Sequence, residues 1–341
     1  MRIDLLLDSR QFGGIEAHVG ELAKALTAAG HKVTVIFICD YGPHPLKTTL
    51  AQQNLPFICL NGNAASVIKT LGARRPDALH THGYKAGILG RLAAQLGGFG
   101  CCSSYHAGEP GRGRVALYNW VDRMTASTAN QIIAVSQKIA AQLPPQTRVV
   151  NNFVDAQQTI SQGLRIAYVG RLSEEKGPDR FIAAAKQLTT QQWHVYGEGP
   201  LRNTLEVSAS HNVIFHGSQA MHDHWQHIGL VVMPSRFEGL PLAALEAMAR
   251  GIPVLASAVG DLPRLIQHNS NGWLIHANTE AAIANTIACN VRQWCALTQQ
   301  RRNHIQQQAK NTVQAHYSAD AVIPQFIHCY QQAATQGARY A

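Results

Sequence analysis

Two acidic residues in an otherwise small and apolar segment are the first candidates for chemistry. Residues 234–257 read PSRFEGLPLAALEAMARGIPVLAS, and Glu238 and Glu246 are the only carboxylates in them. Pro241 is well placed to open a helix, so Glu238 is expected in the turn at a helix N-terminus, where backbone N–H groups and the helix dipole favour a phosphate or a sugar hydroxyl. Glu246 lies about one and a half turns further on. Both carboxylates could therefore accept hydrogen bonds from one elongated ligand.

Two cations follow another expected strand. In YVGRLSEEKGPDRF, Arg171 comes directly after the strand and Lys176 precedes the next helix. Two cations at the carboxyl end of a strand, beside a helix N-terminus, suit a diphosphate. The alternative for this pair is a surface ion-pair cluster of little energy. The alternative for Glu246 is an i,i+4 pair with Arg250 on a solvated helix face, which would also be weak.

A glycine pair after the first strand is a weaker signal. Gly13 and Gly14 stand in DSRQFGGIEAHVGELA, and glycine lets the backbone approach a phosphate closely. Any tight turn would use the same residues. The segment does not contain the G-x-G-x-x-G fingerprint of dinucleotide-binding proteins. A nicotinamide-dependent dehydrogenase therefore has only Asp40, at the end of the second expected strand, in its favour.

Two more turns carry residues that could touch a ligand. His80 and His82 end the strand in LHTHGYKAG and point to the same face, so each could line a cleft or be a buried, hydrogen-bonded histidine. Gly197 and Gly199, in YGEGP, form a turn that could admit a nucleoside base or serve as a turn alone. No cysteine pair or histidine spacing predicts a metal site.

Two series of short apolar runs, separated by helical patterns, must position these residues. Nearly all-apolar strands spaced by helices are typical of parallel sheets covered on both faces, and ligands bind at the carboxyl ends of such strands. A polar, Gln-rich linker is expected at residues 154–165, and helices are expected from about residue 279. The sequence thus predicts two doubly wound α/β domains with a site in the cleft between them. The predicted strands are residues 2–7, 32–39, 57–60, 77–82, 101–106 and 131–136, then 165–170, 193–197, 212–217, 230–235, 253–257 and 272–275.

Composition limits the classes of protein that fit. The chain has 341 residues, 46% of them hydrophobic, and a net charge of +9. The excess is +6 up to residue 155 and +3 after it, which suits an anionic partner or ordinary solubility. No basic stretch is interleaved with aromatic residues, so nucleic acid is not expected as a partner. No apolar run spans a bilayer and no signal peptide is evident, so a cytoplasmic protein is expected.

Taken together, these motifs resemble the retaining glycosyltransferases of family 4. Glu238 and Glu246, separated by seven residues, look like that family's E-x7-E motif. VGRLSEEKG, YGEGP, NVIFHG and NGWLI resemble its other landmarks in the same order, and FGGIEAHVGELAKAL and LHTHGYKAG resemble those near the N-terminus. The resemblance implies the GT-B fold, which is two Rossmann-like doubly wound parallel-sheet domains facing an inter-domain cleft. The expected domains are residues 1–155 for the acceptor and 156–318 for the nucleotide-sugar, with a C-terminal helix at 319–341 crossing back to the first.

The resemblance implies a role for each matched position of the second domain. Arg171 and Lys176 would neutralise the diphosphate of the donor. Glu238 would bind hydroxyl groups of the donor sugar, and Gly239 and Leu240 would offer backbone N–H groups beside it. Charge that builds on the leaving diphosphate would then meet two cations and a helix N-terminus.

It also implies roles for the remaining candidates. Glu246 would take the ribose hydroxyls, and Gly197 and Gly199 would border the donor. In the first domain, Gly14 would bring its amide to a phosphate and His82 would lie near the reacting sugar. The catalytic set is therefore expected to be Glu238, His82, Arg171 and Lys176.

The resemblance also limits cofactors and partners. It implies no metal and no cofactor other than a nucleotide-sugar co-substrate, most simply a UDP- or GDP-sugar. The acceptor would be a saccharide or a lipid-linked saccharide, as in the synthesis of cell-surface polysaccharide or lipopolysaccharide. The basic N-terminal half suggests peripheral contact with an anionic membrane, at the inner face of the cell membrane. Two rivals share the fold: a nucleotide-sugar 2-epimerase and a subunit that binds without catalysing. The chain departs from the family pattern at Gly260-Asp261, where two glycines are usual.

Overall fold

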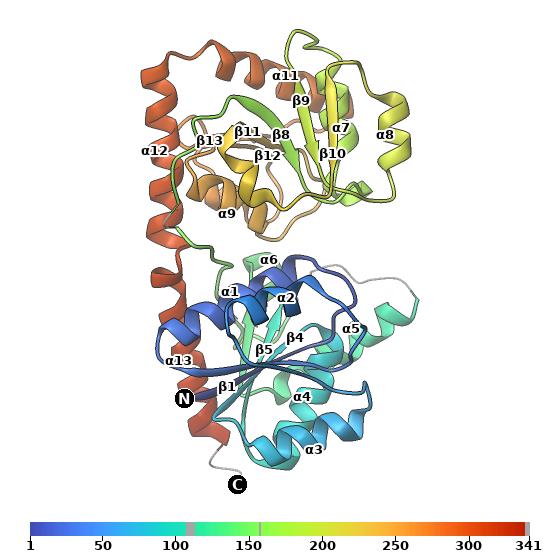
Figure 1. The fold of residues 1–341 in the computed structure, drawn as a ribbon, viewed down its shortest axis with the longest axis vertical. Coiled ribbons are helices and arrows are strands. Elements are labelled where there is room, and N and C mark those ends of the chain that lie inside the picture. The colour runs from blue at the N-terminus through green and yellow to red at the C-terminus, as the bar shows by residue number, and fades with distance from the viewer. Residues whose placement is uncertain (107–112, 157, 338–341) are drawn as a thin grey trace. The chain divides into compact units, whose positions relative to one another are not determined.

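A computed structural model describes residues 1–106, 113–156 and 158–337 (Figure 1). The chain divides into two compact units. The first is Met1–Asn152 together with the C-terminal segment from Ala319, and the second is Phe153–Ser318. Residue 157 of the predicted linker and residues 338–341 of the predicted C-terminal helix lie outside the described residues.

The first unit is built on a parallel sheet that, within the described residues, has seven strands in the order β3-β2-β1-β4-β5-β6-β7. Six of them correspond to predicted apolar runs, which form strands because both faces of the sheet are buried. The seventh, β7, has only two residues and was not predicted, since such a short strand leaves no periodic pattern. The strands are β1 (Arg2–Leu7), β2 (Lys32–Phe37), β3 (Phe57–Cys59), β4 (Ala78–His82), β5 (Gly100–Tyr105), β6 (Gln131–Ala134) and β7 (Arg148–Val149).

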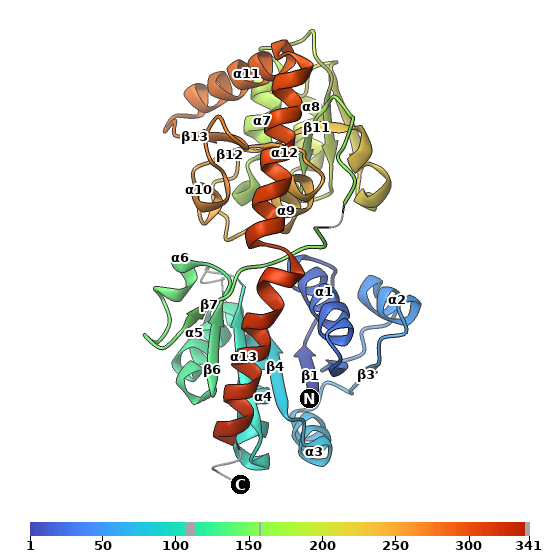
Figure 2. The same cartoon turned by 90° about the vertical axis from the view of Figure 1, so that its left-hand side faces the viewer.

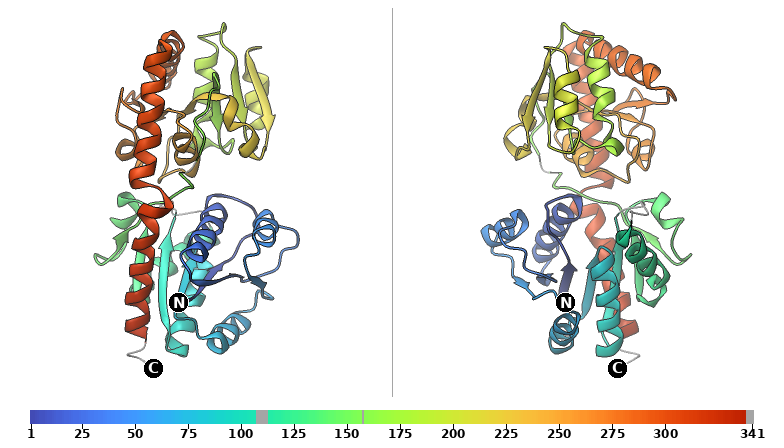
Figure 3. Two further views of the ribbon diagram at one scale, coloured as in Figure 1. Left: turned by 60° about the vertical axis from the view of Figure 1, so that its left-hand side comes forward. Right: turned by 90° about the vertical axis from the view of Figure 1, so that its right-hand side faces the viewer.

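Helices cover both faces of this sheet. α13 (Ala319–Gly337) runs along one face, as Figure 2 shows, and α1 (Gly14–Ala28) packs beside it. α3 (Ala64–Arg74) and α4 (Tyr84–Gly97) cover the other face, and α4 stands in front of the sheet in the right-hand view of Figure 3. Successive side chains of a strand point to opposite faces of the sheet, as two neighbours on β4 show. His80 faces α13, where its Nδ1 lies 2.8 Å from the Tyr330 hydroxyl. Leu79 faces the other way and packs among residues of α3 and α4.

Four more helices or helical turns connect the strands of the first unit. α5 lies against α4 and is followed by the short 3-10 turn η1. α2 packs on α1, and α6 packs on β6. These elements are α2 (Pro45–Gln52), α5 (Arg114–Met124), η1 (Ala126–Thr128) and α6 (Gln137–Ala140).

The second unit repeats the design with six described parallel strands in the order β10-β9-β8-β11-β12-β13. All six were predicted from apolar runs. α9 and α12 bury their apolar residues on one face, and α7 and α11 bury theirs on the other. The strands are β8 (Arg165–Val169), β9 (Trp193–Tyr196), β10 (Val213–Gly217), β11 (Ile228–Met233), β12 (Val254–Ser257) and β13 (Gly272–Ile275). The other elements are η2 (Glu174–Lys176), α7 (Pro178–Ala185), α8 (Arg202–Ser208), η3 (Met221–Asp223), η4 (Trp225–His227), α9 (Leu242–Ala249), α10 (Leu262–Leu265), α11 (Glu280–Ala296) and α12 (Gln299–His316).

Two local expectations need correction. Pro241 is the N-cap of α9, with φ −72° and ψ 129°, and the helix begins one residue later than predicted. The expected linker is packed in part: the buried Ser161 hydroxyl donates to the carbonyl of Ile228 at 2.7 Å. A polar segment of this kind can be held by hydrogen bonds to a neighbouring strand, which composition alone does not reveal.

The C-terminal segment is helical from residue 280, close to the predicted start at about residue 279. Its three helices are the long elements α11, α12 and α13. Across the described residues, none of the helices combines the length and the hydropathy needed to cross a bilayer.

Candidate active site

Every candidate residue of the second unit lies in α9, in the short 3-10 helix η2 or in a loop that follows a strand. Arg171 and Lys176 follow β8, Glu238 follows β11, and Gly197 and Gly199 follow β9. β8 lies between β9 and β11 in the sheet, so these loops share one edge. The topology therefore gathers residues that are more than 60 positions apart in sequence, as in the pair Lys176 and Glu238.

A direct ion pair joins the principal cation and the principal acid. Nζ of Lys176 donates to Oε2 of Glu238 at 2.8 Å. The hydroxyl of Ser235 donates to the other oxygen, Oε1, also at 2.8 Å. Glu238 is only 4% exposed, whereas the Lys176 side chain is 33% exposed. The carboxylate is thus held in a fixed orientation, and the ammonium group keeps access to solvent.

Backbone hydrogen bonds hold the two loops together. The amides of Arg236 and Phe237 donate to the carbonyl of Glu175 at 2.9 and 3.1 Å. The Arg236 guanidinium binds both oxygens of Asp179 on α7, at 2.8 and 2.6 Å. The hydrogen bonds that Arg236 donates to Asp179 raise the pKa of Arg236, so this cation stays charged. The Lys176–Glu238 pair therefore rests on a rigid pair of loops.

Glycines allow these loops to pack closely. A Cβ on Gly177 would lie 2.3 Å from the carbonyl oxygen of Pro234, and one on Gly260 would lie 2.3 Å from that of Glu238. A Cβ on Gly197 would lie 1.9 Å from the oxygen of Gly170. Gly199 is similarly restricted, 2.4 Å from the carbonyl of Leu172. These glycines have a packing role, and a contact of Gly197 and Gly199 with a nucleoside stays a prediction.

Three other candidates of the second unit, Arg171, Gly239 and Leu240, lie close in sequence to Lys176 or Glu238. Arg171 is exposed, and its carbonyl accepts a hydrogen bond from the Tyr168 hydroxyl at 2.7 Å. Leu240 is buried in the core, and the Gly239 carbonyl accepts from the next loop, from the amide of Asp261, at 2.9 Å.

Glu246 is half-buried on α9. Nη1 of Arg250 donates to the backbone carbonyl of Glu246 at 2.9 Å, and the Arg250 guanidinium lies 5.7 Å from the centre of the Trp225 ring. Arg250 thus uses its i,i+4 position to bind the backbone of the helix. The role of the Glu246 carboxylate toward ribose stays a prediction.

Gly14 and His82 belong to the first unit. Gly14 is the exposed first residue of α1, and a Cβ there would meet nothing within 4 Å. His82 ends β4, beside the end of β1, where it pairs in register with Leu7. Because the chain order reverses between β1 and β4, this is the switch point at which doubly wound sheets bind ligands.

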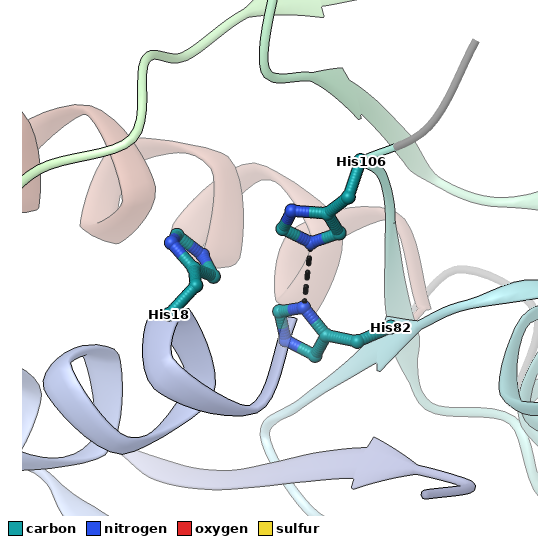
Figure 4. A group of neighbouring side chains, drawn as sticks. All are labelled: His18, His82 and His106. Carbon is teal, nitrogen blue, oxygen red and sulfur yellow. Dashed lines mark hydrogen bonds between the residues drawn. The ribbon is translucent and has the colours of Figure 1, made fainter. Parts of the chain in front are cut away.

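His82 lies in a group of three histidines, drawn in Figure 4. One ring nitrogen from each of His18, His82 and His106 lies within 4.8 Å of the others. Nδ1 of His82 is 3.1 Å from Nε2 of His106, while Nε2 of His82 is buried and has no hydrogen-bond partner in the described structure. This group is the one set of His, Cys, Asp and Glu side chains in the described residues that could hold a metal ion.

Burial keeps these imidazoles neutral. Burial, together with the neighbouring imidazoles, lowers the pKa of His82 well below its usual value. Burial also lowers the pKa of His106 to about 4. A neutral imidazole can donate or accept one hydrogen bond at each nitrogen, and Nε2 of His82 has no such partner among the described residues. A contact of His82 with a substrate sugar stays a prediction.

A cavity of about 330 Å³ adjoins this group in the first unit. Its walls carry charged groups from several elements, including Glu16 on α1 and Lys85 on α4. His82, His106 and Asn119 of α5 are also part of the polar lining. A larger cavity, of about 860 Å³, lies near Gln95, and none of the described residues that line it has a titratable side chain.

Sequence reasoning missed several residues of these sites. Ser235 stands next to a predicted strand end, but its bond to Glu238 depends on the conformation of the turn. His18 follows Gly14 by one helical turn, and His106 directly follows β5, the strand next to β4. His106 was detectable in principle, because His82 pairs in register with Ser104, which puts His106 on the same face of the sheet.

Comparison with known proteins identifies the family. Residues 12–158 match Glycosyltransferase Family 4, and residues 163–292 match Glycosyl transferases group 1. An uncharacterized glycosyltransferase of Methanocaldococcus jannaschii is 24% identical, over 94% of this chain and 95% of the relative. The UDP-Gal:alpha-D-GlcNAc-diphosphoundecaprenol alpha-1,3-galactosyltransferase of Escherichia coli is 26% identical, over 69% and 71% of the two chains.

Solved structures agree on the fold. The crystal structure of HepE from Anabaena, in complex with UDP and glucose, superposes with a TM-score of 0.84 at 19% identity. The similarity covers 97% of this chain and 99% of HepE. With its two parallel-sheet α/β units and the family matches along most of its length, the chain belongs to glycosyltransferase family 4 and is a glycosyltransferase of the GT-B fold.

Proposed function

We propose that the protein is a retaining, metal-independent glycosyltransferase. It moves a sugar from a nucleotide-sugar to a saccharide or lipid-linked saccharide acceptor, in the cytoplasm, for cell-surface polysaccharide or lipopolysaccharide synthesis. The observation that carries this proposal is the Lys176–Glu238 pair, held by two interlocked loops at the carboxyl edge of the second sheet. The position is where an open α/β sheet binds its ligand.

The donor would occupy the second unit. Its diphosphate is placed beside Lys176 and Arg171, and the Lys176 side chain is exposed enough to turn from Glu238 to a phosphate. Glu238 then accepts hydrogen bonds from the donor sugar, and Glu246 accepts them from the ribose. Cations fixed at the leaving group stabilise the negative charge that develops as the glycosidic bond breaks.

Retention would follow a front-face reaction. The bond between the anomeric carbon and the diphosphate oxygen breaks, and the acceptor oxygen forms its bond on the same face. The acceptor proton passes to an oxygen of the departing phosphate, so no protein nucleophile is needed. Glu238 would position the sugar in this scheme. His82 of the first unit would bind a sugar hydroxyl, a role supported by its Nε2 atom, which has no hydrogen-bond partner among the described residues.

The relatives support a choice of substrates. HepE was crystallised with UDP and glucose, and the Escherichia coli relative transfers galactose from UDP-Gal to a diphosphoundecaprenol-linked sugar. A UDP-sugar donor and a lipid-linked acceptor are therefore the first pair to assay, with GDP-sugars as the alternative donors. Since a ligand at 100 times its dissociation constant stabilises a protein by about 2.7 kcal/mol, thermal shifts with UDP-, GDP- and ADP-sugars will identify the donor.

Replacement of Lys176 tests the proposal. Lys176→Ala is expected to lower the turnover number for transfer by about 100-fold or more, because it removes charge stabilisation from the leaving group. Lys186→Ala, which removes an exposed lysine near the end of α7, is the matched control and should transfer normally. Near-normal turnover in Lys176→Ala would refute the assignment. The anomeric configuration of the product, measured by NMR, decides retention.

Two further measurements separate the rivals. An epimerase would convert a UDP-sugar and release a free epimerised sugar with no acceptor present, whereas a transferase would leave the donor largely intact. A binding subunit would show the thermal shift but form no product. Transfer that survives EDTA treatment would support metal independence, and loss of transfer restored by a divalent cation would point instead to the His18, His82 and His106 group.

A further inference from the structure

Helix α5 (Arg114–Met124) has its polar side inward and its apolar side outward. Asp122, at 6% exposed, is buried on this helix, and its carboxylate pairs with Arg91 of α4 at 2.7 Å. Asn119 and Asp122 line the 330 Å³ cavity of the first unit. A helix that packed only to bury apolar surface would have the opposite polarity.

The outward side of α5 is unusually apolar. Eleven large hydrophobic side chains are exposed in the described part of the chain, and five of them lie on this eleven-residue helix. Leu117, Trp120 and Met124 recur at i, i+3 and i+7, so they share one face, and they are 60%, 59% and 64% exposed. Such a concentration marks an interaction surface. The other two are Val115 and Tyr118.

We propose that the outward side of α5 docks the protein on the surface of an anionic lipid bilayer. Four of its five exposed side chains, Leu117, Tyr118, Trp120 and Met124, are together named the α5 face, whereas the fifth, Val115, lines the cavity. Tryptophan and tyrosine favour the boundary between headgroups and acyl chains, because each has an apolar ring and a polar tip. An interfacial helix buries its apolar face by roughly 5–10 Å in that boundary without crossing the membrane.

Charge favours a lipid surface over a protein partner. The first unit, counted as residues 1–152 and 319–341, has sixteen lysines and arginines against nine aspartates and glutamates, a net charge of +7. The second unit has thirteen against eleven, which leaves +2. Almost the whole positive charge of the chain is thus in the unit that carries the α5 face. Anionic lipids attract such a unit, and stable attachment needs both the charge and the apolar contact.

Docking would bring the cavity of the first unit to the membrane surface, where a lipid-linked acceptor would be found. This role of the docking rests on the proposed function. The α5 face and the cavity lie on opposite sides of one helix, and His82 and His106 line the same cavity. A saccharide carried on a membrane lipid would meet the first unit at the bilayer surface, close to polar groups that could bind it. The acceptor would therefore be a saccharide anchored to a membrane lipid.

Vesicle binding tests the docking without donor or acceptor. Trp120 is the only tryptophan of the first unit, and the four in the second unit are at most 4% exposed. Sedimentation with phosphatidylcholine vesicles containing about 30% phosphatidylglycerol is expected to pellet the protein, and Trp120 emission should shift to the blue. Brominated lipids should quench that emission, and Trp120→Phe identifies its share of the signal. Phosphatidylcholine alone should bind at least about ten-fold less protein, because the attraction is partly electrostatic.

Substitutions on the α5 face give the matched comparison. Leu117→Glu and Met124→Glu are each expected to weaken vesicle binding by about ten-fold or more, since a charge replaces an apolar side chain that the bilayer would bury. Val207→Glu, at an 89% exposed apolar residue of α8 in the second unit, should bind as the unchanged protein does. All three should transfer normally to a water-soluble acceptor. That readout distinguishes failure of the docking from failure of the proposed function.

Three outcomes would overturn the docking proposal. One is equal binding of Leu117→Glu and the unchanged protein to anionic vesicles. Another is the absence of binding to them. The third is a lipid-free dimer that Leu117→Glu converts to a monomer, which would assign the α5 face to a second copy of the chain.

Discussion

At the scale of single residues, the Lys176 ammonium and the Glu238 carboxylate form an ion pair with each other. In the proposed complex, each would instead bind a different part of the donor. Lys176 and Glu238 are 2.8 Å apart, and the buried carboxylate also has the Ser235 hydroxyl. Leaving the buried carboxylate of Glu238 without a partner would be costly. A nucleotide-sugar would offer both replacements at once, a phosphate for the ammonium and a hydroxyl for the carboxylate. The pair therefore keeps the site ordered before a ligand binds and favours a ligand that has both groups.

This exchange predicts opposite effects for its two members. Glu238→Gln keeps an acceptor for Ser235 but releases Lys176, so UDP affinity should be unchanged or higher. Lys176→Ala should weaken UDP binding. Both should transfer poorly, and Glu238→Gln should lose about ten-fold or more in turnover, because a hydrogen bond to a charged acceptor is worth about 1.5–3 kcal/mol. Calorimetric titration with UDP measures the difference, and equal weakening in both variants would contradict the exchange.

At the scale of elements, loops from neighbouring strands build the donor site. The loop after β11 is bonded to the loop after β8 through the Glu175 carbonyl, and the loop after β12 supports it through Gly260 and Asp261. Gly260 has φ +59°, and a Cβ there would lie 2.3 Å from the carbonyl oxygen of Glu238. Where the family usually has two glycines, this chain thus retains Gly260, which packing requires, and has Asp261 in the second position.

Gly260→Ala should therefore damage the site beyond its cost in backbone strain. A left-handed conformation costs alanine on the order of 1–2 kcal/mol, and the added methyl group would also push the turn at Glu238. Gly30→Ala is the matched control, because Gly30 has φ +84° and a Cβ there would meet nothing within 4 Å. Both variants should unfold more easily, but transfer activity should fall about ten-fold or more only in Gly260→Ala, through the lost orientation of Glu238. Normal kinetics in Gly260→Ala would show that the turn tolerates the shift.

The elements also show how far the sequence could predict this protein. Twelve of the thirteen described strands were predicted, because strands buried on both faces are continuous apolar runs that stand out in sequence. The two-residue β7 has no such pattern. From the sequence, Lys176 and Glu238 could be expected only to lie at the same edge of the sheet. Their direct ion pair could not be predicted, because it depends on the conformation of two turns that are 62 positions apart. The inverted polarity of α5 was not predicted, since the side on which a helix packs is set by tertiary contacts.

At the scale of the whole molecule, the two units bury different kinds of groups beside their sheets. The second unit packs apolar side chains on both faces and buries the imidazole of His194, which lies 2.9 Å from that of His216. The first has imidazoles under α13: His80 is fully buried, with Nδ1 2.8 Å from the Tyr330 hydroxyl and Nε2 2.7 Å from that of Ser104. Burial and the neighbouring His106 lower the pKa of His80 to about 3. The stability of the first unit should therefore depend on pH more strongly than that of the second.

The direction of that dependence follows from proton uptake. In the unfolded chain His80 titrates near pH 6.5, so below that pH the unfolded state binds a proton that the folded state, with its pKa of about 3, does not. Stability is fully present above pH 6.5 and falls as the pH is lowered, by about 1.4 kcal/mol per pH unit for one imidazole.

Urea unfolding of the first unit at about pH 7.5 and about pH 5.5, followed through Trp120, measures this loss. His80→Gln should reduce the difference between the two pH values by about 1 kcal/mol. His222→Gln, at a side chain that is 89% exposed, should leave it unchanged. An equal pH difference in His80→Gln and the unchanged protein would mean that His80 does not stay neutral in the folded unit, and that the polar partners Tyr330 and Ser104 stabilise its charged form instead.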